Sequence, residues 1–284
     1  MRLTTVRTST GDRAGRIEDD RIVLLPWNDL SHLLSQPGWQ NLAGAHGETV
    51  PLADADLATL LPDPDKIICV GLNYVSHIEE MGRQRPDHPT LFAKYRGALI
   101  GPTDAVQLPA VSEAMDWEVE LGVVIGRAGR YVAEADALDH VVGYCVVNDA
   151  TARDWQHRTT QFLAGKTFES TTPVGPVLVT PDELFRPDGL GLRVQCEVDG
   201  ELMQDGQHLR LVLHAGSDRR LREPDHHPPA RRPDRHGHAR RRGRRSRPED
   251  VSPTRIDHAH HGGGDRRTRQ PVRAVDCGTP DAIA

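Results

Sequence analysis

The chain has 284 residues, of which 37% are apolar and 27% charged, and its 35 basic and 41 acidic side chains give a formal net charge of −6. This length suits one or two domains. No apolar run approaches the ~20 residues of a membrane-spanning helix, and the N-terminal residues lack the apolar core of a signal peptide. The four cysteines (Cys69, Cys145, Cys196 and Cys277) are far apart and fit no metal-binding spacing. Composition therefore favours a soluble protein of the reduced cytoplasm, with no membrane partner.

Residues 1–62 are predicted to form a small N-terminal α/β appendage. Residues 21–25 read as a short strand, and residues 28–36 have helical spacing that stops at Pro37-Gly38. The sequence Pro62-Asp63-Pro64 marks the boundary with the next part. No chemically distinctive motif is visible in this segment.

Residues 63–206 are predicted to form a β-rich α+β core. Short runs rich in β-branched residues stand between Gly and Pro, at residues 67–70, 91–93, 119–125, 141–147, 174–179 and 192–198. One helix is predicted over residues 74–81, and the stretch 150–161 is ambiguous between loop and a short helix. Because regular helices do not alternate with the strands, the pattern argues against a doubly wound parallel sheet.

Residues 207–284 differ sharply in composition from the rest. They contain 18 Arg, no Lys and 10 acidic residues, against 17 basic and 31 acidic residues in 1–206, and all Phe, Trp and Tyr residues lie before this segment. So few apolar side chains cannot offset an ordering cost of ~1–2 kcal/mol per residue. We therefore expect an Arg-rich tail that is disordered and does not fold alone.

Two interpretations of this tail compete: a nucleic-acid-binding arm, because clustered Arg neutralises phosphates, and translation out of frame. No aromatic residue is interleaved for base stacking, which disfavours nucleic acid as a partner. Residues 229–241 can be encoded so that a one-base shift reads Leu-Pro-Gly-Asp-Leu-Ile-Ala-Thr-Gly-Thr-Pro-Gly-Gly, an ordinary strand-and-turn sequence. The out-of-frame interpretation is therefore preferred.

The segment Asp116-Trp117-Glu118-Val119-Glu120-Leu121 is the most informative in the core. On a strand Glu118 and Glu120 share one face, and two carboxylates ~7 Å apart repel by roughly 2 kcal/mol at an effective dielectric constant near 20. Asp149, at the end of a predicted strand, adds a third carboxylate. Oxygen ligands without Cys or His favour Mg²⁺ or Mn²⁺. The competing interpretation places Glu118 and Glu120 on the solvent face of an edge strand, and spacing alone leaves both open.

His77 and Glu80 lie three residues apart on the predicted helix over residues 74–81 and are therefore neighbours on its surface. A carboxylate beside an imidazole orients the ring and raises its basicity, as a water-activating base requires. An incidental pair on a surface helix is the alternative.

Lys166 is one of three lysines, with Lys66 and Lys94, in a chain that otherwise uses Arg. Its compact ammonium suits a substrate carboxylate or a developing enolate. A solvated loop lysine is the alternative interpretation.

In chain order, these motifs resemble the fumarylacetoacetate hydrolase family, in particular its acylpyruvate hydrolase-like branch. The resemblance runs from about residue 66 to residue 206. It rests on Gly71-Leu72-Asn73-Tyr74 with His77 and Glu80, Leu91-Phe92-Ala93-Lys94, Trp117-Glu118-Val119-Glu120-Leu121, Asn148-Asp149-Ala150-Thr151-Ala152-Arg153-Asp154, Lys166 and Pro173-Val174-Gly175-Pro176. The family continues with further strands and a Thr-Gly-Thr-Pro turn, which the chain lacks after Gly206 and which the shifted reading restores.

The resemblance implies a mixed β-roll, a homodimer, and Mg²⁺ or Mn²⁺ held by Glu118, Glu120 and Asp149. His77 and Glu80 would then activate water, Lys166 would bind substrate or its enolate, and Gln156 would line the substrate site. The implied reaction is metal-dependent hydrolysis of a C–C bond in a 2,4-dioxo acid of acylpyruvate or fumarylpyruvate type, a chemistry of aromatic catabolism. The alternatives are a decarboxylase or isomerase of a 2-oxo or 2-hydroxy-dienoic diacid on the same site, or an inactive member of the family whose altered C-terminal part leaves the roll incomplete.

Overall fold

A computed structural model describes residues 1–71, 88–184 and 192–207, together with the backbone of Arg267–Thr268. These residues belong to one compact unit, and a second unit, Asp218–Asp265, lies outside the described residues. The helix predicted over residues 74–81, with His77 and Glu80, also lies outside them, as does almost all of the segment 207–284.

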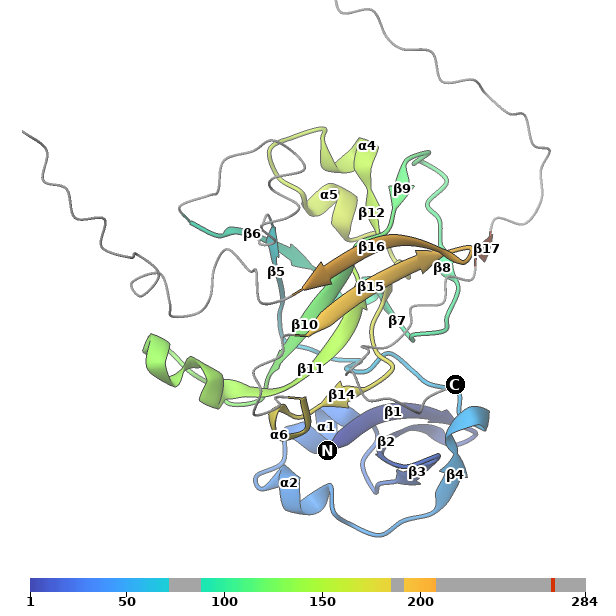
Figure 1. The fold of residues 1–284 in the computed structure, drawn as a ribbon, viewed down its shortest axis with the longest axis vertical. Coiled ribbons are helices and arrows are strands. Elements are labelled where there is room, and N and C mark those ends of the chain that lie inside the picture. Colours follow the sequence, from blue (N-terminus) through green and yellow to red (C-terminus); the bar gives the residue numbers. More distant parts are fainter. Residues whose placement is uncertain (72–87, 185–191, 208–266, 269–284) are drawn as a thin grey trace, which may run out of the picture. The chain divides into compact units, whose positions relative to one another are not determined.

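The largest sheet has seven strands in the order β10-β11-β14-β1-β2-β3-β4, with antiparallel pairing between all neighbours (Figure 1). Residues 1–62 and residues 63–206 therefore contribute strands to one common sheet. Its strands are β1 (Arg2–Thr8), β2 (Gly11–Glu18), β3 (Arg21–Leu24), β4 (Thr49–Pro51), β10 (Val119–Ile125), β11 (Val141–Asn148) and β14 (Leu178–Val179).

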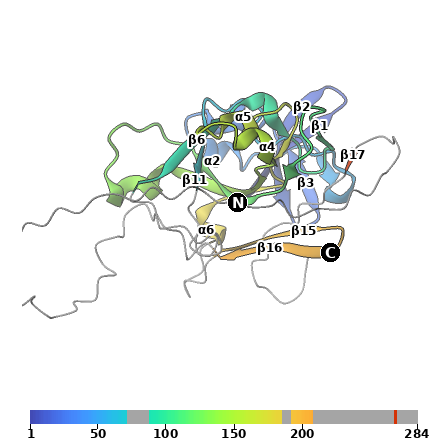
Figure 2. The same ribbon diagram turned by 90° about the horizontal axis from the view of Figure 1, so that it is seen from above.

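The remaining described strands form two-stranded sheets. Figure 2 shows β15 and β16 as a long antiparallel ribbon. The pairs are β5 (Ile67–Gly71) with β6 (Thr90–Lys94), β7 (Leu99–Ile100) with β13 (Thr172–Pro173), β9 (Met115–Asp116) with β12 (Thr151–Ala152), β15 (Arg193–Val198) with β16 (Glu201–Gln207), and β8 (Val106–Gln107) with β17 (Arg267–Thr268). Only the β7–β13 pair among these is parallel.

The described helices are short. They are α1 (Leu30–Leu34), α2 (Trp39–Leu42), α4 (Arg153–Gln156), α5 (Leu163–Lys166), α6 (Pro181–Leu184) and the 3₁₀ turns η1 (Leu52–Asp54), η2 (Arg96–Ala98) and η3 (Glu134–His140). The side chain of Asp29 caps α1 by accepting a hydrogen bond from the amide of His32. No helix in the described part of the chain is long and apolar enough to cross a membrane.

The main apolar core lies between the seven-stranded sheet and α1. Leu3 of β1, Leu30 and Leu33 of α1 and Leu178 of β14 are fully buried in one cluster. A strand-rich α+β fold with few short helices is thus confirmed. β14 and β1, far apart in sequence, pair antiparallel and bring Leu178 and Leu3 together in this core.

An ion pair ties β1 to the turn that follows β7. The guanidinium of Arg7 contacts both carboxylate oxygens of Asp104, at 3.0 and 2.5 Å, and the amide of Gly101 donates to the same carboxylate at 2.7 Å. Burial raises the pKa of Asp104, but these hydrogen bonds outweigh it and leave the pKa below its ordinary value of 3.8. The carboxylate therefore stabilises the fold above about pH 4 and loses this contribution as the pH falls through its lowered pKa.

We expect Asp104→Asn to lower the free energy of unfolding by about 1 kcal/mol at pH 7 and by less at pH 3, because below the ordinary carboxyl pKa of 3.8 the unfolded wild-type chain takes up a proton at Asp104. Urea unfolding at both pH values measures the two differences. Asp63→Asn is the control, because the Arg96–Asp63 pair is 68% and 70% exposed and should contribute little. An equal loss from Asp104→Asn at the two pH values would contradict the assigned role.

Candidate active site

Glu118 and Asp149 are neighbours because of the register between β10 and β11. Val119 pairs with Asn148, so the residue before β10 and the residue after β11 lie side by side. The amide of Asp149 donates to the carbonyl oxygen of Glu118 at 2.8 Å, and the amide of Glu118 donates to Oδ1 of Asn148 at 3.1 Å. Two carboxylates that are 31 residues apart in sequence are thereby fixed at one end of the sheet.

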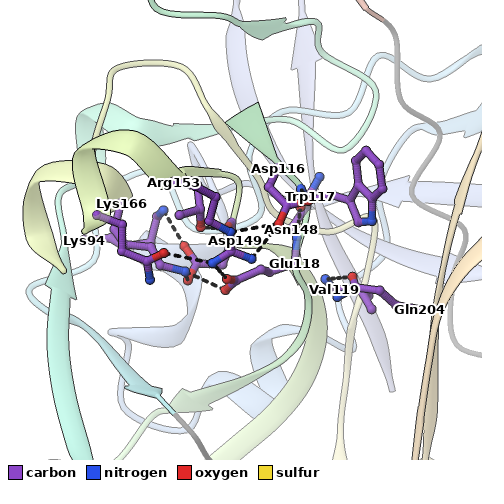
Figure 3. Close-up of polar contacts among 12 residues, drawn as sticks. Lys94, Asp116, Trp117, Glu118, Val119, Asn148, Asp149, Arg153, Lys166 and Gln204 are labelled. Atoms are coloured by element: carbon purple, nitrogen blue, oxygen red, sulfur yellow. Dashed lines mark hydrogen bonds and ion pairs between the residues drawn. The ribbon is translucent and has the colours of Figure 1, made fainter. Parts of the chain in front are cut away.

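Lys166, the last residue of α5, places its ammonium between these two carboxylates (Figure 3). Its Nζ lies 2.5 Å from Oε2 of Glu118 and 2.7 Å from Oδ2 of Asp149, and the side chain is 2% exposed. Nζ also lies 5.1 Å from the centroid of the Phe92 ring, within cation–π range. The interpretation of Lys166 as a solvated loop lysine is therefore wrong.

A second buried lysine holds the other oxygen of Asp149. Nζ of Lys94, at the end of β6, lies 2.6 Å from Oδ1 of Asp149, and the two side chains are 1% and 4% exposed. No role was predicted for Lys94, although it is, like Lys166, one of the three lysines of the chain. Lysine is rare in this chain, and both buried lysines contact Asp149.

Arg153, at the start of α4, holds Glu118 from the opposite side. Its guanidinium contacts Oε1 of Glu118 at 2.5 Å and Oδ2 of Asp116 at 2.7 Å, and it donates to Oε1 of Gln156 at 2.9 Å. Burial lowers the pKa of Arg153, but the negative charges of Glu118 and Asp116 outweigh this and raise it. Gln156, predicted to line the substrate site, is buried and joins the cluster through Arg153.

Glu120 lies two residues beyond Glu118 on β10. Within β10, Val119 and Leu121 pack into apolar clusters, so Glu120 lies on the other face of the strand. Glu120 and Asp149 both act electrostatically on Cys69 of β5. Burial raises the pKa of the Cys69 thiol to about 12, and the charges of Asp149 and Glu120 add to this effect.

The donor set has the chemistry that a hard divalent ion requires. Oxygen atoms of Glu118 and Asp149 already converge on one cation, the ammonium of Lys166, and Glu120 is a third carboxylate close by, two residues after Glu118 in the chain. Within the described residues, however, no three His, Cys, Asp or Glu side chains are grouped closely enough to hold a metal ion. A protein cation stands at the point where the two carboxylates meet.

The structure therefore brings together Glu118, Asp149, Lys166 and Gln156 of the predicted site, and Glu120 lies two residues after Glu118, within β10. His77 and Glu80 lie outside the described residues. The residues that the sequence analysis missed are Lys94, Arg153 and Asp116, all charged and all in contact with Glu118, Asp149 or Arg153.

Close packing of α5 against α4 sets the position of Lys166. A Cβ added at Gly165 would come within 2.5 Å of the Gln156 amide nitrogen and 2.6 Å of the Ala152 carbonyl oxygen, both backbone atoms. We expect Gly165→Ala to lower the free energy of unfolding by about 1–3 kcal/mol and to reduce any activity that depends on Lys166. Gly97→Ala is the control, since its Cβ would meet nothing closer than 4.0 Å. Equal stability of the two variants in urea unfolding would contradict this packing argument.

Comparison with known proteins decides the family. Residues 66–216, just over half of the chain, match the family of the fumarylacetoacetate (FAA) hydrolase C-terminal domain. The chain belongs to this family. The family predicted from the motifs around Glu118, Asp149 and Lys166 is thereby confirmed.

Relatives in this family are enzymes with different reactions. The mitochondrial oxaloacetate tautomerase fahd2 of Xenopus laevis is 43% identical over 166 residues, which cover 57% of this chain and 51% of the tautomerase. The chain thus spans about half the length of that relative.

Solved structures share the fold over most of the chain. The 5-carboxymethyl-2-hydroxymuconate delta-isomerase of Mycobacterium smegmatis has a TM-score of 0.61 at 30% identity, covering 74% of this chain and 77% of the isomerase. The maleylpyruvate hydrolase of Sphingobium sp. SYK-6, solved with manganese(II) and pyruvate, has a TM-score of 0.60 at 31% identity, covering 76% of this chain and 80% of the hydrolase.

Proposed function

We propose that this chain is a divalent-metal-dependent hydrolase that cleaves a C–C bond in a 2,4-dioxo acid of acylpyruvate type. The observation that carries the proposal is the buried ammonium of Lys166 held between the carboxylates of Glu118 and Asp149. Support comes from the family, which includes a maleylpyruvate hydrolase solved with manganese(II) and pyruvate. Pyruvate is the oxo-acid product that acylpyruvate cleavage would release.

Glu118, Glu120 and Asp149 are the residues that would hold the metal, Mg²⁺ or Mn²⁺. A bound divalent ion would supply Lewis-acid polarisation of the substrate oxygens and a template for their orientation. Lys94 and Arg153 keep the carboxylates of Asp149 and Glu118 in fixed positions, because each holds one oxygen of its partner.

The proposed reaction adds water to the distal carbonyl carbon and breaks the adjacent C–C bond. The bonding electrons pass to the 2-oxo acid fragment, which leaves as an enolate, and the other fragment leaves as a carboxylic acid. Lys166 donates a hydrogen bond to the enolate oxygen, whose negative charge a buried ammonium stabilises. We assign removal of the proton from the attacking water to His77 and Glu80, which lie outside the described residues, and return of that proton to the enolate carbon yields the 2-oxo acid.

Enol–keto isomerisation of a 2-oxo diacid is the second candidate. The observation that favours it is the 43% identity to an oxaloacetate tautomerase. That reaction also passes through an enolate, so Lys166 would have the same role, but no water is consumed. In both cases the proposed substrate is a small 2-oxo acid. We also propose that the chain forms a homodimer.

The experiment that tests the proposal offers the purified full chain acetylpyruvate and enol-oxaloacetate, each with Mn²⁺ and with a chelator. We expect Mn²⁺-dependent loss of acetylpyruvate with release of equal amounts of pyruvate and acetate. Turnover of oxaloacetate alone would replace the hydrolase proposal by the isomerase. Folded protein without turnover of either compound would favour an inactive member of the family.

A further inference from the structure

The four oxygens of Glu118 and Asp149 are divided between outer and inner cations (Figure 3). The outer oxygens, Oε1 of Glu118 and Oδ1 of Asp149, are held by Arg153 and Lys94 respectively. The inner oxygens, Oε2 and Oδ2, share the single ammonium of Lys166. Each carboxylate thus has a cation of its own at the outer oxygen and shares Lys166 with the other carboxylate at the inner oxygen.

Because of this division, the cation between the two inner oxygens can be exchanged for another without disturbing the outer contacts. If Lys166 withdrew, Arg153 and Lys94 would still orient both carboxylates, and the inner oxygens would remain aimed at one point. A cation of higher charge would then find two oxygen ligands already in place. Lysine suits such an exchange, because its ammonium is a point charge on a flexible four-carbon stem.

A divalent cation and the Lys166 ammonium cannot occupy this point together. Their charges have the same sign, and at ~4 Å a singly and a doubly charged cation repel by several kcal/mol at an effective dielectric constant near 20. The inner oxygens already contact Nζ at 2.5 and 2.7 Å, which leaves no room for a second ion between them. The Phe92 ring, 5.1 Å from Nζ, offers the ammonium a second favourable surface.

We propose that Lys166 occupies the metal position in the metal-free protein and leaves it when a divalent cation binds between Glu118 and Asp149. Lys166 therefore reaches the oxo-acid substrate only in the metal-loaded protein, and metal binding precedes productive substrate binding. The inference rests on the proposed function, because it assumes that these carboxylates bind a metal.

Lysine labelling of the wild-type full chain tests the exchange directly. The protein is reductively methylated with and without Mn²⁺, and labelling at each lysine is measured by mass spectrometry. We expect Mn²⁺ to raise labelling of Lys166 several-fold and to leave Lys94 protected, with exposed Lys66 as the control for the reagent. Unchanged or lower labelling of Lys166 with Mn²⁺ bound overturns the proposal.

Calorimetric titration with Mn²⁺ provides the second measurement. Lys166→Met should bind Mn²⁺ about tenfold more tightly than the wild type or better, because no charge-assisted hydrogen bond has to be broken first. Lys94→Met removes the same charge from the outer oxygen of Asp149 and should gain less. Equal gains, or no gain in Lys166→Met, overturn the proposal.

The exchange of Lys166 and the metal site itself can be disproved separately. If the wild type binds Mn²⁺ while Lys166 stays protected, the exchange is wrong and the metal site stands. If the wild type binds no Mn²⁺, both are wrong. The labelling uses no variant, so the proposal stays testable even if Lys166→Met fails to fold.

Discussion

Replacing Glu118 by Gln is expected to lower metal-dependent turnover about 1000-fold or more, because Lewis-acid stabilisation by a bound metal is worth several kcal/mol. The amide keeps the shape of the side chain and an oxygen that accepts from Lys166 or Arg153, so the fold should survive. The variant loses the negative charge that contacts Arg153 and Lys166. Turnover of acetylpyruvate at saturating Mn²⁺, with Mn²⁺ affinity measured separately, gives the effect.

Glu113→Gln is the matched control for this experiment. Glu113 lies five residues earlier in the chain and is exposed, so the same change of chemistry there should leave turnover and Mn²⁺ affinity as in the wild type. If Glu118→Gln retained wild-type turnover with the same metal requirement, Glu118 would have no part in the metal site.

Asp149→Asn is expected to lower the free energy of unfolding by about 3–5 kcal/mol, because it leaves buried ammonium groups without their charged partner. Lys94 is 1% exposed, and its ammonium contacts Asp149 at 2.6 Å. The energetic cost at Lys166 is smaller, because its ammonium keeps its contact with Glu118. Urea unfolding of the metal-free protein measures the loss without a contribution from metal binding.

The double variant Lys94→Met/Asp149→Asn separates this charge effect from simple loss of packing. Removing the stranded ammonium should recover part of the stability, so that the double variant is at least as stable as Asp149→Asn. If the two single losses instead add in the double variant, Lys94 and Asp149 do not stabilise the fold as a pair.

The strands that carry the site could be predicted from the sequence because their side chains are apolar and β-branched. The runs at residues 119–125 and 141–147 correspond to β10 (Val119–Ile125) and β11 (Val141–Asn148). Alternation along this run also predicted that Glu118 and Glu120 share one face, but Glu118 lies just before the start of β10. The short helix at the start of the ambiguous stretch 150–161 is α4.

Some strands, such as β1, were not predicted because their buried side chains are not all apolar. In β1 the buried positions include Thr4 and Thr5, which are fully buried because their hydroxyls donate to the carbonyl oxygens of Pro176 and Leu60. Hydropathy does not reveal such residues as core. The strand predicted over residues 174–179 is formed only in part: Leu178–Val179 is β14 and Val174 makes an isolated bridge with Val147, whereas Pro176 has no amide for a strand hydrogen bond.

The charged network of the site depends on tertiary contacts that no local pattern encodes. Lys94 and Lys166 lie 72 residues apart, on different elements, and meet at Asp149, just after β11. Spacing alone left metal binding open, and the family resemblance implied three carboxylates around a metal. The structure adds three protein cations, Lys94, Arg153 and Lys166, which hold two of those carboxylates in the described part of the chain.

The location of a bound metal tests the central claim most directly. A crystal of the full chain grown with Mn²⁺ and pyruvate, with diffraction recorded at the manganese absorption edge, would locate the ion by its anomalous signal. The account predicts one strong peak within bonding distance of carboxylate oxygens of Glu118 and Asp149. A fully loaded crystal with the manganese bound elsewhere, and Lys166 still between the two carboxylates, would contradict it.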